Sequence, residues 1–128
     1  MLGLATIRHG TVHAHHGAIF CIRLVGDAGE RLTRSDIASV SYSVYSTTGR
    51  DDGTPIVGHS EVSIPVEDSV LTSYLNWSID TKGYNVRVAI PHTVVEPFAT
   101  RGQRYRVEIT ITTNGGRHVL VPFLVTAL

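Results

Sequence analysis

The chain has 128 residues, its 11 basic residues balance 11 acidic ones, and charged residues make up 17% of the sequence. This length suits a single domain over residues 1–128, and a neutral, weakly charged chain offers no overall attraction for nucleic acid and little repulsion between its own copies. The N-terminus lacks the features of a signal peptide, and no apolar run reaches the ~20 residues of a membrane helix, so we expect neither a leader nor a membrane partner.

Three strands are predicted in the first half of the chain. Residues 1–16 form either an edge strand or an extended arm. The run "GAIFCIRLVG" (17–26) is apolar on both faces, which is typical of a central or partner-covered strand. Its single cysteine, Cys21, excludes an internal disulfide, favours a reducing compartment and is expected to be a small buried hydrophobe. In "ASVSYSVYS" (38–46) apolar residues alternate with serines. The residues predicted to face the core are Ala38, Val40, Tyr42 and Val44.

The second half adds shorter strands and a closing hairpin. In "HSEVSIPV" one face carries Val62, Ile64 and Val66, and "YNVRVAIP" alternates in the same way before Pro91. The run "VEDSVLTSYLNW" (66–77) predicts either a helix of a turn or two or a strand-to-strand crossover over one end of the core. Two alternating runs, 103–113 and 117–127, flank "TNGG". They predict a hairpin with Asn-Gly in a two-residue loop, because both residues tolerate positive φ.

These elements predict an all-β protein: an antiparallel β-sandwich of about seven strands with at most one short helix. Alternating residues of the longer strands supply the candidate core. Its predicted members are Phe20, Val40, Tyr42, Val44, Trp77, Val88, Tyr105, Val107, Ile109 and Phe123.

Four of the seven histidines lie within "HGTVHAHHG", at positions 9, 13, 15 and 16. In a strand His13 and His15 share a face, and two imidazoles at that spacing can hold zinc, copper or nickel. A complete site also needs a distant ligand, from another histidine such as His59, His92 or His118 or from a carboxylate. We therefore favour a histidine-containing arm and predict no metal site.

Other patterns for chemistry are incomplete. Asp27 and Glu30, like the acidic pair at 51–52, adjoin glycines but lack the ordered oxygen ligands of a calcium loop, so they are expected to be turn residues. His59, Ser60 and Glu61 are consecutive. In a strand the histidine and the glutamate would face away from the serine, which is the wrong geometry for activating a nucleophile.

Two surface features remain. Five arginines (Arg87, Arg101, Arg104, Arg106 and Arg117) form a candidate basic face near the last hairpin, and we favour a solvated or subunit-contacting face over a nucleic-acid groove because no aromatic residues interleave with them. The last strand, "HVLVPFLVTAL", is apolar on both faces, with Leu120 and Leu124 outward and Pro122 restricting it to an edge or a bulge. Such a leucine row is expected either to bind a partner or to be covered by the N-terminal arm.

The run "GQRYRVEITITTNGG" resembles the penultimate strand and closing hairpin of immunoglobulin-like and fibronectin-type modules, which makes Tyr105 the candidate for their tyrosine corner. The succession "LVGDAGERLTRSDIASVSYSVYSTTG", "LNWSIDTKGYNVRVAIP" and "YRVEITI…HVLVPFLVTAL" is similar to small virion proteins of tailed phages and prophages, such as head-decoration, head–tail and baseplate or tail components. The resemblance implies a scaffold or adaptor role among other virion proteins, in the virion or in the cytoplasm of an infected bacterium. It transfers no catalytic residue.

We therefore expect a non-enzymatic subunit of a multi-protein assembly, in a homo-oligomer or symmetric array, with no cofactor. An arm from Leu2 to His16 would add a strand to the sheet edge of a neighbour. The residues predicted for the interaction surface are Leu2, His13, His15, Leu120, Leu124 and Leu128. The alternative is a carbohydrate- or cell-surface-binding module, which needs an exposed aromatic platform. The aromatic residues available for it are Tyr45, Tyr74, Trp77 and Tyr84. A small metallo-hydrolase is a third hypothesis, and it requires a bound metal.

Overall fold

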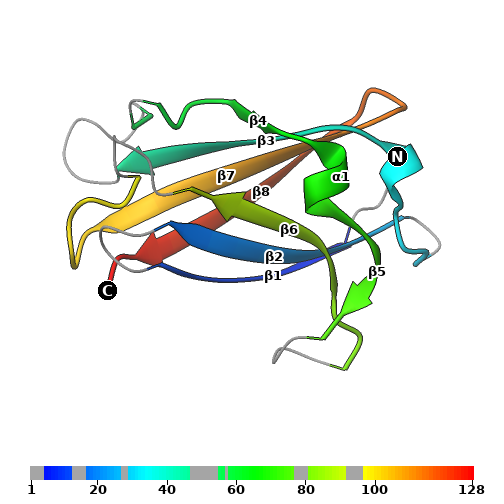
Figure 1. Ribbon diagram of the computed structural model, residues 1–128, viewed down its shortest axis with the longest axis horizontal. Helices are drawn as coiled ribbons and strands as arrows, with labels where there is room; N and C mark the ends of the chain where they lie inside the picture. The colour runs from blue at the N-terminus through cyan, green and yellow to red at the C-terminus, as the bar shows by residue number, and fades with distance from the viewer. Residues whose placement is uncertain are drawn as a thin grey trace.

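Two four-stranded antiparallel sheets pack face to face in the computed structural model (Figure 1). The structure describes residues 17–26, 29–46, 55–56, 58–76, 81–91 and 97–128, and the backbone of residues 5–12. Sheet A contains, in spatial order, β1 (Ala5–Val12), β2 (Ala18–Val25), β6 (Tyr84–Ile90) and β5 (Val70–Leu75). Sheet B contains β4 (Val62–Ile64), β3 (Ile37–Ser46), β7 (Arg104–Thr113) and β8 (His118–Thr126).

This arrangement confirms the all-β sandwich. The described residues form eight strands, and all their pairings are antiparallel. In the letters used for immunoglobulin-like sandwiches the order is A-B-E-D against C′-C-F-G. β1 is an edge strand of its own sheet, paired with β2 and lying against β8 of sheet B. Residues 5–12 therefore follow the edge-strand alternative and not the extended arm.

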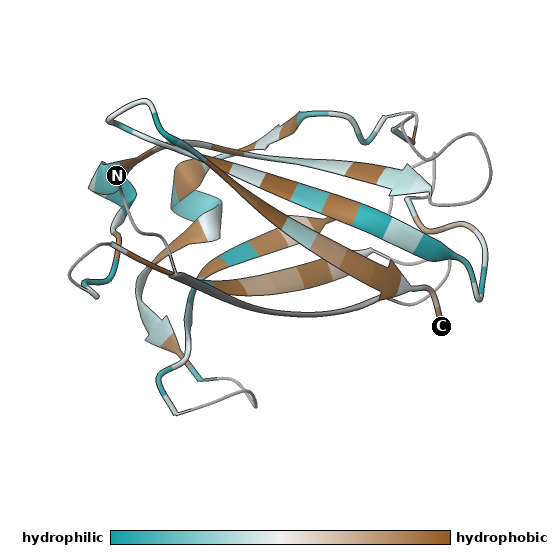
Figure 2. Ribbon diagram, turned by 180° about the vertical axis from the view of Figure 1, so that it is seen from behind, coloured by the Kyte–Doolittle hydropathy of each residue, from teal (hydrophilic) through white to brown (hydrophobic). Residues whose placement is uncertain are grey.

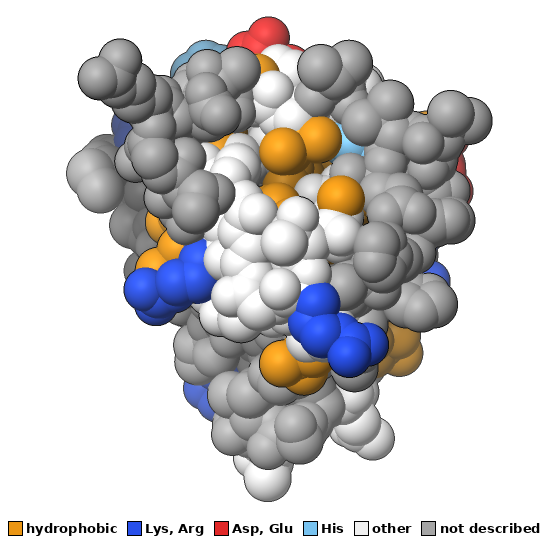
Figure 3. Space-filling view, turned by 90° about the vertical axis from the view of Figure 1, so that its left-hand side faces the viewer, with side chains coloured by type: hydrophobic (Ala, Val, Ile, Leu, Met, Phe, Trp, Pro, Cys, Tyr) orange, Lys and Arg blue, Asp and Glu red, His pale blue; other side chains and the backbone are white. Residues whose placement is uncertain are grey.

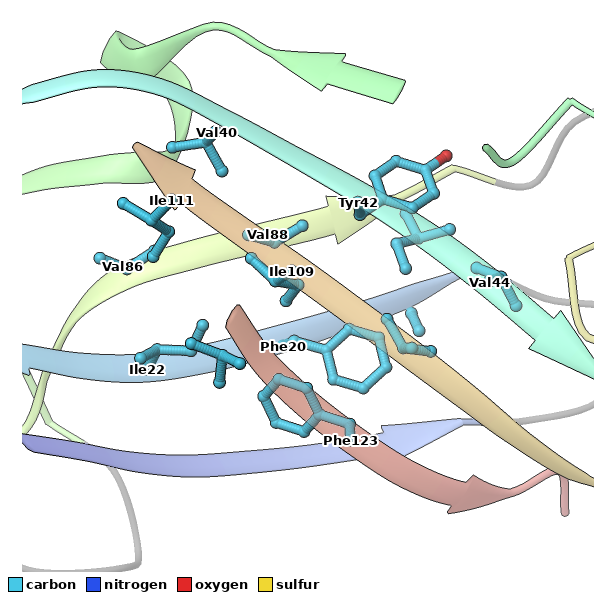
Figure 4. Close-up of a cluster of buried hydrophobic side chains, with 14 of the residues drawn as sticks. Phe20, Ile22, Val40, Tyr42, Val44, Val86, Val88, Ile109, Ile111 and Phe123 are labelled. Atoms are coloured by element: carbon cyan, nitrogen blue, oxygen red, sulfur yellow. The ribbon is translucent and has the colours of Figure 1, made fainter. Parts of the chain in front are cut away.

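The core lies between the central strands of the two sheets. Period-two alternation turns every second residue of β2, β3, β6 and β7 inward. Figure 2 shows the resulting apolar and polar bands along β7, whereas β8 is apolar along most of its length. The rings of Phe20 and Phe123 meet between the sheets with centroids 4.6 Å apart (Figure 4). Nine of the ten predicted core residues are buried, and the tenth, Trp77, lies outside the described residues.

The first residues of β3 depart from the simple alternation of buried and exposed side chains. The pairing with β7 shifts between Ile37 and Ser39, so that Ala38 is the extra residue of a bulge. Ile37 is buried and Ala38 is exposed. The prediction that Ala38 faces the core is therefore wrong, because one inserted residue reverses the side-chain faces upstream of it.

The described part of the segment 66–77 leads from sheet B into sheet A. A single helical turn, α1 (Val66–Ser69), follows β4 and leads directly into β5, so Val66 begins a helix and does not extend the preceding strand. Figure 1 places α1 at the end of the sandwich opposite the C terminus. Arg34, in a short 3₁₀ turn (Arg34–Asp36), holds this link with hydrogen bonds from Nε to the Val70 carbonyl (2.7 Å) and from Nη2 to the Glu67 carbonyl (2.8 Å). Of the two alternatives for this segment, the crossover is the better description.

The hairpin between β7 and β8 is present, but its turn differs from the predicted one. Gly116 N–H donates to the Thr113 carbonyl (2.9 Å), and Gly116 alone in this turn has a positive φ, of 83°. A hairpin loop whose last residue has a left-handed φ is typical of the three-residue loop with a β-bulge. Asn114 and Gly115 keep negative φ values, so the predicted two-residue loop is wrong while the hairpin is right.

Two hydrogen-bonded side chains close the ends of the core. Tyr105 Oη accepts the backbone N–H of Thr100 at 3.0 Å, and the Tyr105 ring meets Phe98 edge-on, which makes the tyrosine corner implied by the resemblance. Asn85 is fully buried in β6. Its Oδ1 accepts Leu24 N–H at 2.7 Å, and its Nδ2 donates to the carbonyls of Leu24 and Leu32, so a side chain continues the β2–β6 ladder beyond its last backbone pair.

Replacing Tyr105 by Phe should lower the free energy of unfolding by about 1–2 kcal/mol, because the Thr100 N–H loses its acceptor while the ring packing is kept. Urea unfolding followed by fluorescence measures the change. Tyr74→Phe is the matched control, since Tyr74 lies half-buried on β5. Equal effects of the two substitutions would contradict a specific role for the corner.

The turn geometry predicts opposite behaviour for two neighbouring glycines. Gly116→Ala should cost about 1 kcal/mol, because alanine is strained at positive φ. Gly115→Ala should be close to neutral, because the added Cβ meets only ordinary contacts. The melting temperatures of the two variants distinguish the two loop types. In a two-residue Asn-Gly loop, Gly115 and not Gly116 would be the position at which alanine is destabilising.

Candidate interaction surface

The outer face of sheet B brings together most of the features that sequence analysis singled out. Residues that pair across neighbouring strands form rows on this face. One row joins Tyr45, Arg106 and Leu124, and the row that contains Ser43 also contains Glu108 and Pro122. The next outward row joins Ser63, Ser41, Thr110 and Leu120. Small hydroxyl side chains therefore fill the β4–β3 side, and apolar ones fill the β8 side.

A groove of about 340 Å³ follows the small side chains, and we call it the serine groove. The hydroxyl residues that line it are Ser39, Ser41, Ser43, Ser63 and Thr110. The rest of its lining is Tyr45, Glu61, Glu108 and Leu120. Larger side chains on both sides create the depression. The described lining contains no histidine or cysteine that would activate a serine hydroxyl.

One side of the groove carries a stacked cation. The Arg106 guanidinium carbon lies 4.4 Å from the centre of the Tyr45 ring, and Arg106 Nε is 3.7 Å from Glu108 Oε1. Both members of the ion pair are partly exposed, at 33% and 21%, so water screens their attraction. Arg106 therefore covers the face of Tyr45 that an aromatic binding platform would present.

An apolar row runs along β8 next to the groove, and we call it the leucine row. Leu120, Leu124 and Leu128 are 56%, 58% and 57% exposed. β8 is an edge strand, one of the two positions that Pro122 allowed, and Leu120 belongs both to the row and to the groove lining. β1 lies beside β8, and the three leucines are exposed next to it.

The other candidate residues are dispersed. Arg87 lies on β6 of sheet A, and Arg117 lies at the opposite end of β7 from Arg104, so the five arginines do not form one basic face. Figure 3 shows basic side chains in separate groups at the end of the sandwich that carries the C terminus. Tyr74 and Tyr84 are half-buried in sheet A, across the sandwich from Tyr45.

The N-terminal candidates, Leu2, His13 and His15, lie outside the described residues, as do His16, His92 and the side chain of His9. Within the described part of the chain no group of three or more histidine, cysteine or acidic residues could hold a metal ion. The same residues contain no helix with the length and hydrophobicity needed to span a bilayer.

His59 belongs to the core and not to a strand face. It is fully buried, its Nδ1 shares a hydrogen bond of 2.9 Å with Tyr42 Oη, and burial raises the pKa of the Tyr42 phenol. Glu61 has a left-handed φ of 49° and its N–H donates to Ser43 Oγ at 2.8 Å. The expected strand, with His59 and Glu61 on one face, is therefore wrong. No sequence period pointed to this buried polar pair.

Cys21 differs from the small buried hydrophobe that its apolar neighbours predicted. It lies half-buried on the outer side of β2, as a free thiol. Partial burial raises the thiol pKa, and a hydrogen bond with Tyr84 and the charge of Arg87 offset part of this rise. The thiol is therefore kept protonated under conditions in which an open thiol ionises.

We expect Cys21 to react with iodoacetamide about tenfold more slowly in the folded protein than in urea at pH 8, because the raised pKa and the partial burial both reduce exposed thiolate. The folded state also holds the Cys21 thiol proton more tightly than the unfolded state does. The free energy of unfolding should therefore fall as pH rises above the ordinary thiol pKa. Mass spectrometry of alkylation against pH measures both the rate and the midpoint. A midpoint below that of glutathione would contradict the pKa direction.

A scan against protein-family models finds no match, and searches of curated proteins and of solved structures find no significant one. The features that support a function are therefore those of the described surface: the serine groove, the leucine row and the Arg106–Glu108 pair between them.

Proposed function

We propose that this domain is a non-enzymatic structural or adaptor subunit that docks on neighbouring subunits through the outer face of sheet B. The observation that supports the proposal is the leucine row, in which Leu120, Leu124 and Leu128 each expose more than half of their surface. Two of these leucines lie on the edge strand β8 and Leu128 follows its end, and exposed apolar side chains gathered in this way form the kind of patch that marks protein contacts. The proposed partners are further copies of the chain and other proteins of the same assembly.

The expected free energies favour a weak contact repeated between many copies over a single strong contact. Burying one of these half-exposed leucines contributes about 2 kcal/mol. Association itself costs roughly 4–15 kcal/mol in lost freedom and ordering, so the row alone supports only weak pairwise binding. A symmetric array repeats the same contact many times, and repetition supplies the stability that one contact lacks.

The contact is proposed for the face and not for a sheet edge. β4 has only three residues, β8 contains Pro122, which has no N–H to donate, and the carbonyls of Val70 and Leu71 in β5 accept hydrogen bonds from Arg34 and Arg31. Each of these features opposes the addition of a strand. At β4, β8 and β5, side chains are therefore better placed than backbone groups to make the contact.

The biological setting that we propose is a tailed-phage particle, in a decoration, head–tail or tail position. This setting rests on the sequence resemblance to small virion proteins. The described surface is compatible with it, because a sandwich with one apolar flank and neutral overall charge suits a repeated scaffold contact.

Leu120→Lys and Leu124→Lys should each weaken self-association about 30-fold, since each removes about 2 kcal/mol of apolar burial. Sedimentation velocity over a wide range of protein concentrations measures the association constant. Ile19→Lys is the matched control, because Ile19 is 52% exposed but lies on β2 of the other sheet. A chain that stays monomeric at every concentration, or an Ile19 variant as weak as the leucine variants, would overturn the proposal.

A further inference from the structure

The serine groove has an acidic row across it. Ser43 of β3 pairs with Glu108 of β7, and on its other side the N–H of Glu61 donates to Ser43 Oγ at 2.8 Å. Two glutamates that are 47 positions apart in the sequence therefore flank one serine. Ser43 is only 7% exposed, so the base of the row is closed, and both glutamates belong to the lining of the groove.

The charge of this row is only partly balanced. The described lining of the groove includes both carboxylates and no lysine or arginine. Arg106 lies beside Glu108 at 3.7 Å but is stacked on Tyr45, outside the lining. Glu61 is exposed, and within the described part of the chain no cation pairs with its carboxylate. The groove therefore favours a positive group over a negative one.

An apolar side chain adjoins the acidic row. Leu120, which is 56% exposed, lines the groove in the next row of the sheet and begins the leucine row. Lysine and arginine combine a long apolar stem with a positive head. In the groove the stem would lie on Leu120, the head would meet Glu61 and Glu108, and the serine hydroxyls would accept its remaining N–H groups.

We propose that the serine groove accepts a lysine or arginine side chain from an extended segment of the docked partner protein. This inference rests on the proposed docking function and names the chemistry of the partner. The leucine row supplies affinity, and the acidic row selects which segment binds, because a matching charge favours one partner and a like charge excludes others.

The test uses three capped tripeptides, acetyl-Leu-Ser-Arg-amide and its Glu and Gln analogues, titrated into the ¹⁵N-labelled full chain. The Arg peptide should shift the amide signals of Ser41, Ser43 and Thr110, the shifts should weaken with added salt, and the Glu peptide should leave these signals unchanged. Glu61→Gln should weaken Arg-peptide binding about threefold, the size expected for one exposed ion pair. Glu67→Gln, on the exposed side of α1, is the matched control and should have no effect.

Equal shifts with the Arg and Glu peptides, an absence of shifts at the groove, or an effect of Glu67→Gln as large as that of Glu61→Gln would overturn the inference. These outcomes are distinct from failure of the docking function. If Leu124→Lys abolishes self-association but the groove does not prefer the Arg peptide, the docking face stands and the cation site does not. If the chain does not self-associate, the docking function itself fails.

Discussion

The contact between two inward-facing apolar layers is the interaction on which the rest of this structure depends. β2 and β6 of sheet A meet β3, β7 and β8 of sheet B, and the rings of Phe20 and Phe123 lie 4.6 Å apart where the layers join. Because strand side chains alternate, committing one set of residues to this contact forces the other set outward. The serines of β3, two threonines of β7 (Thr110 and Thr112) and the leucines of β8 face outward as a consequence of where the core lies.

Closing the ends of that core requires polar groups inside it. Asn85 supplies the hydrogen bonds that β2 lacks after its backbone ladder with β6 ends. Tyr105 ties the β6–β7 connection to β7, and Tyr42 and His59 satisfy one another beside β3. Each group is buried with its hydrogen bond made, which avoids the free-energy cost of an unpaired polar atom. These side chains therefore define where the strands and loops must stop.

The same constraint gives the two flanks of sheet B different chemistry. On the β4 side the serines leave room above the sheet, and Glu61, in the turn before β4, lines that space. On the β8 side most side chains of both strand faces are apolar. The inward-facing ones fill the core, and the outward-facing leucines remain in solvent. A face with a small polar groove and an apolar ridge can distinguish partners by charge while gaining affinity from burial.

The sequence by itself determined the sandwich and most of its core, because a period of two is a local property that each strand carries in its own residues. It also predicted that Leu120 and Leu124 face outward and restricted the strand of Pro122 to an edge or a bulge, of which the structure has the edge. It missed the bulge at Ala38, the three-residue turn ending at Gly116, and the burial of His59, since each depends on how one segment is paired or covered by another. The serine groove could not be predicted from the sequence, because it also depends on how the strands are paired. Only tertiary structure sets the register between β3 and β7, which places Glu108 beside Ser43, and the hydrogen bond from Glu61 N–H to Ser43 Oγ, which places Glu61 on the other side.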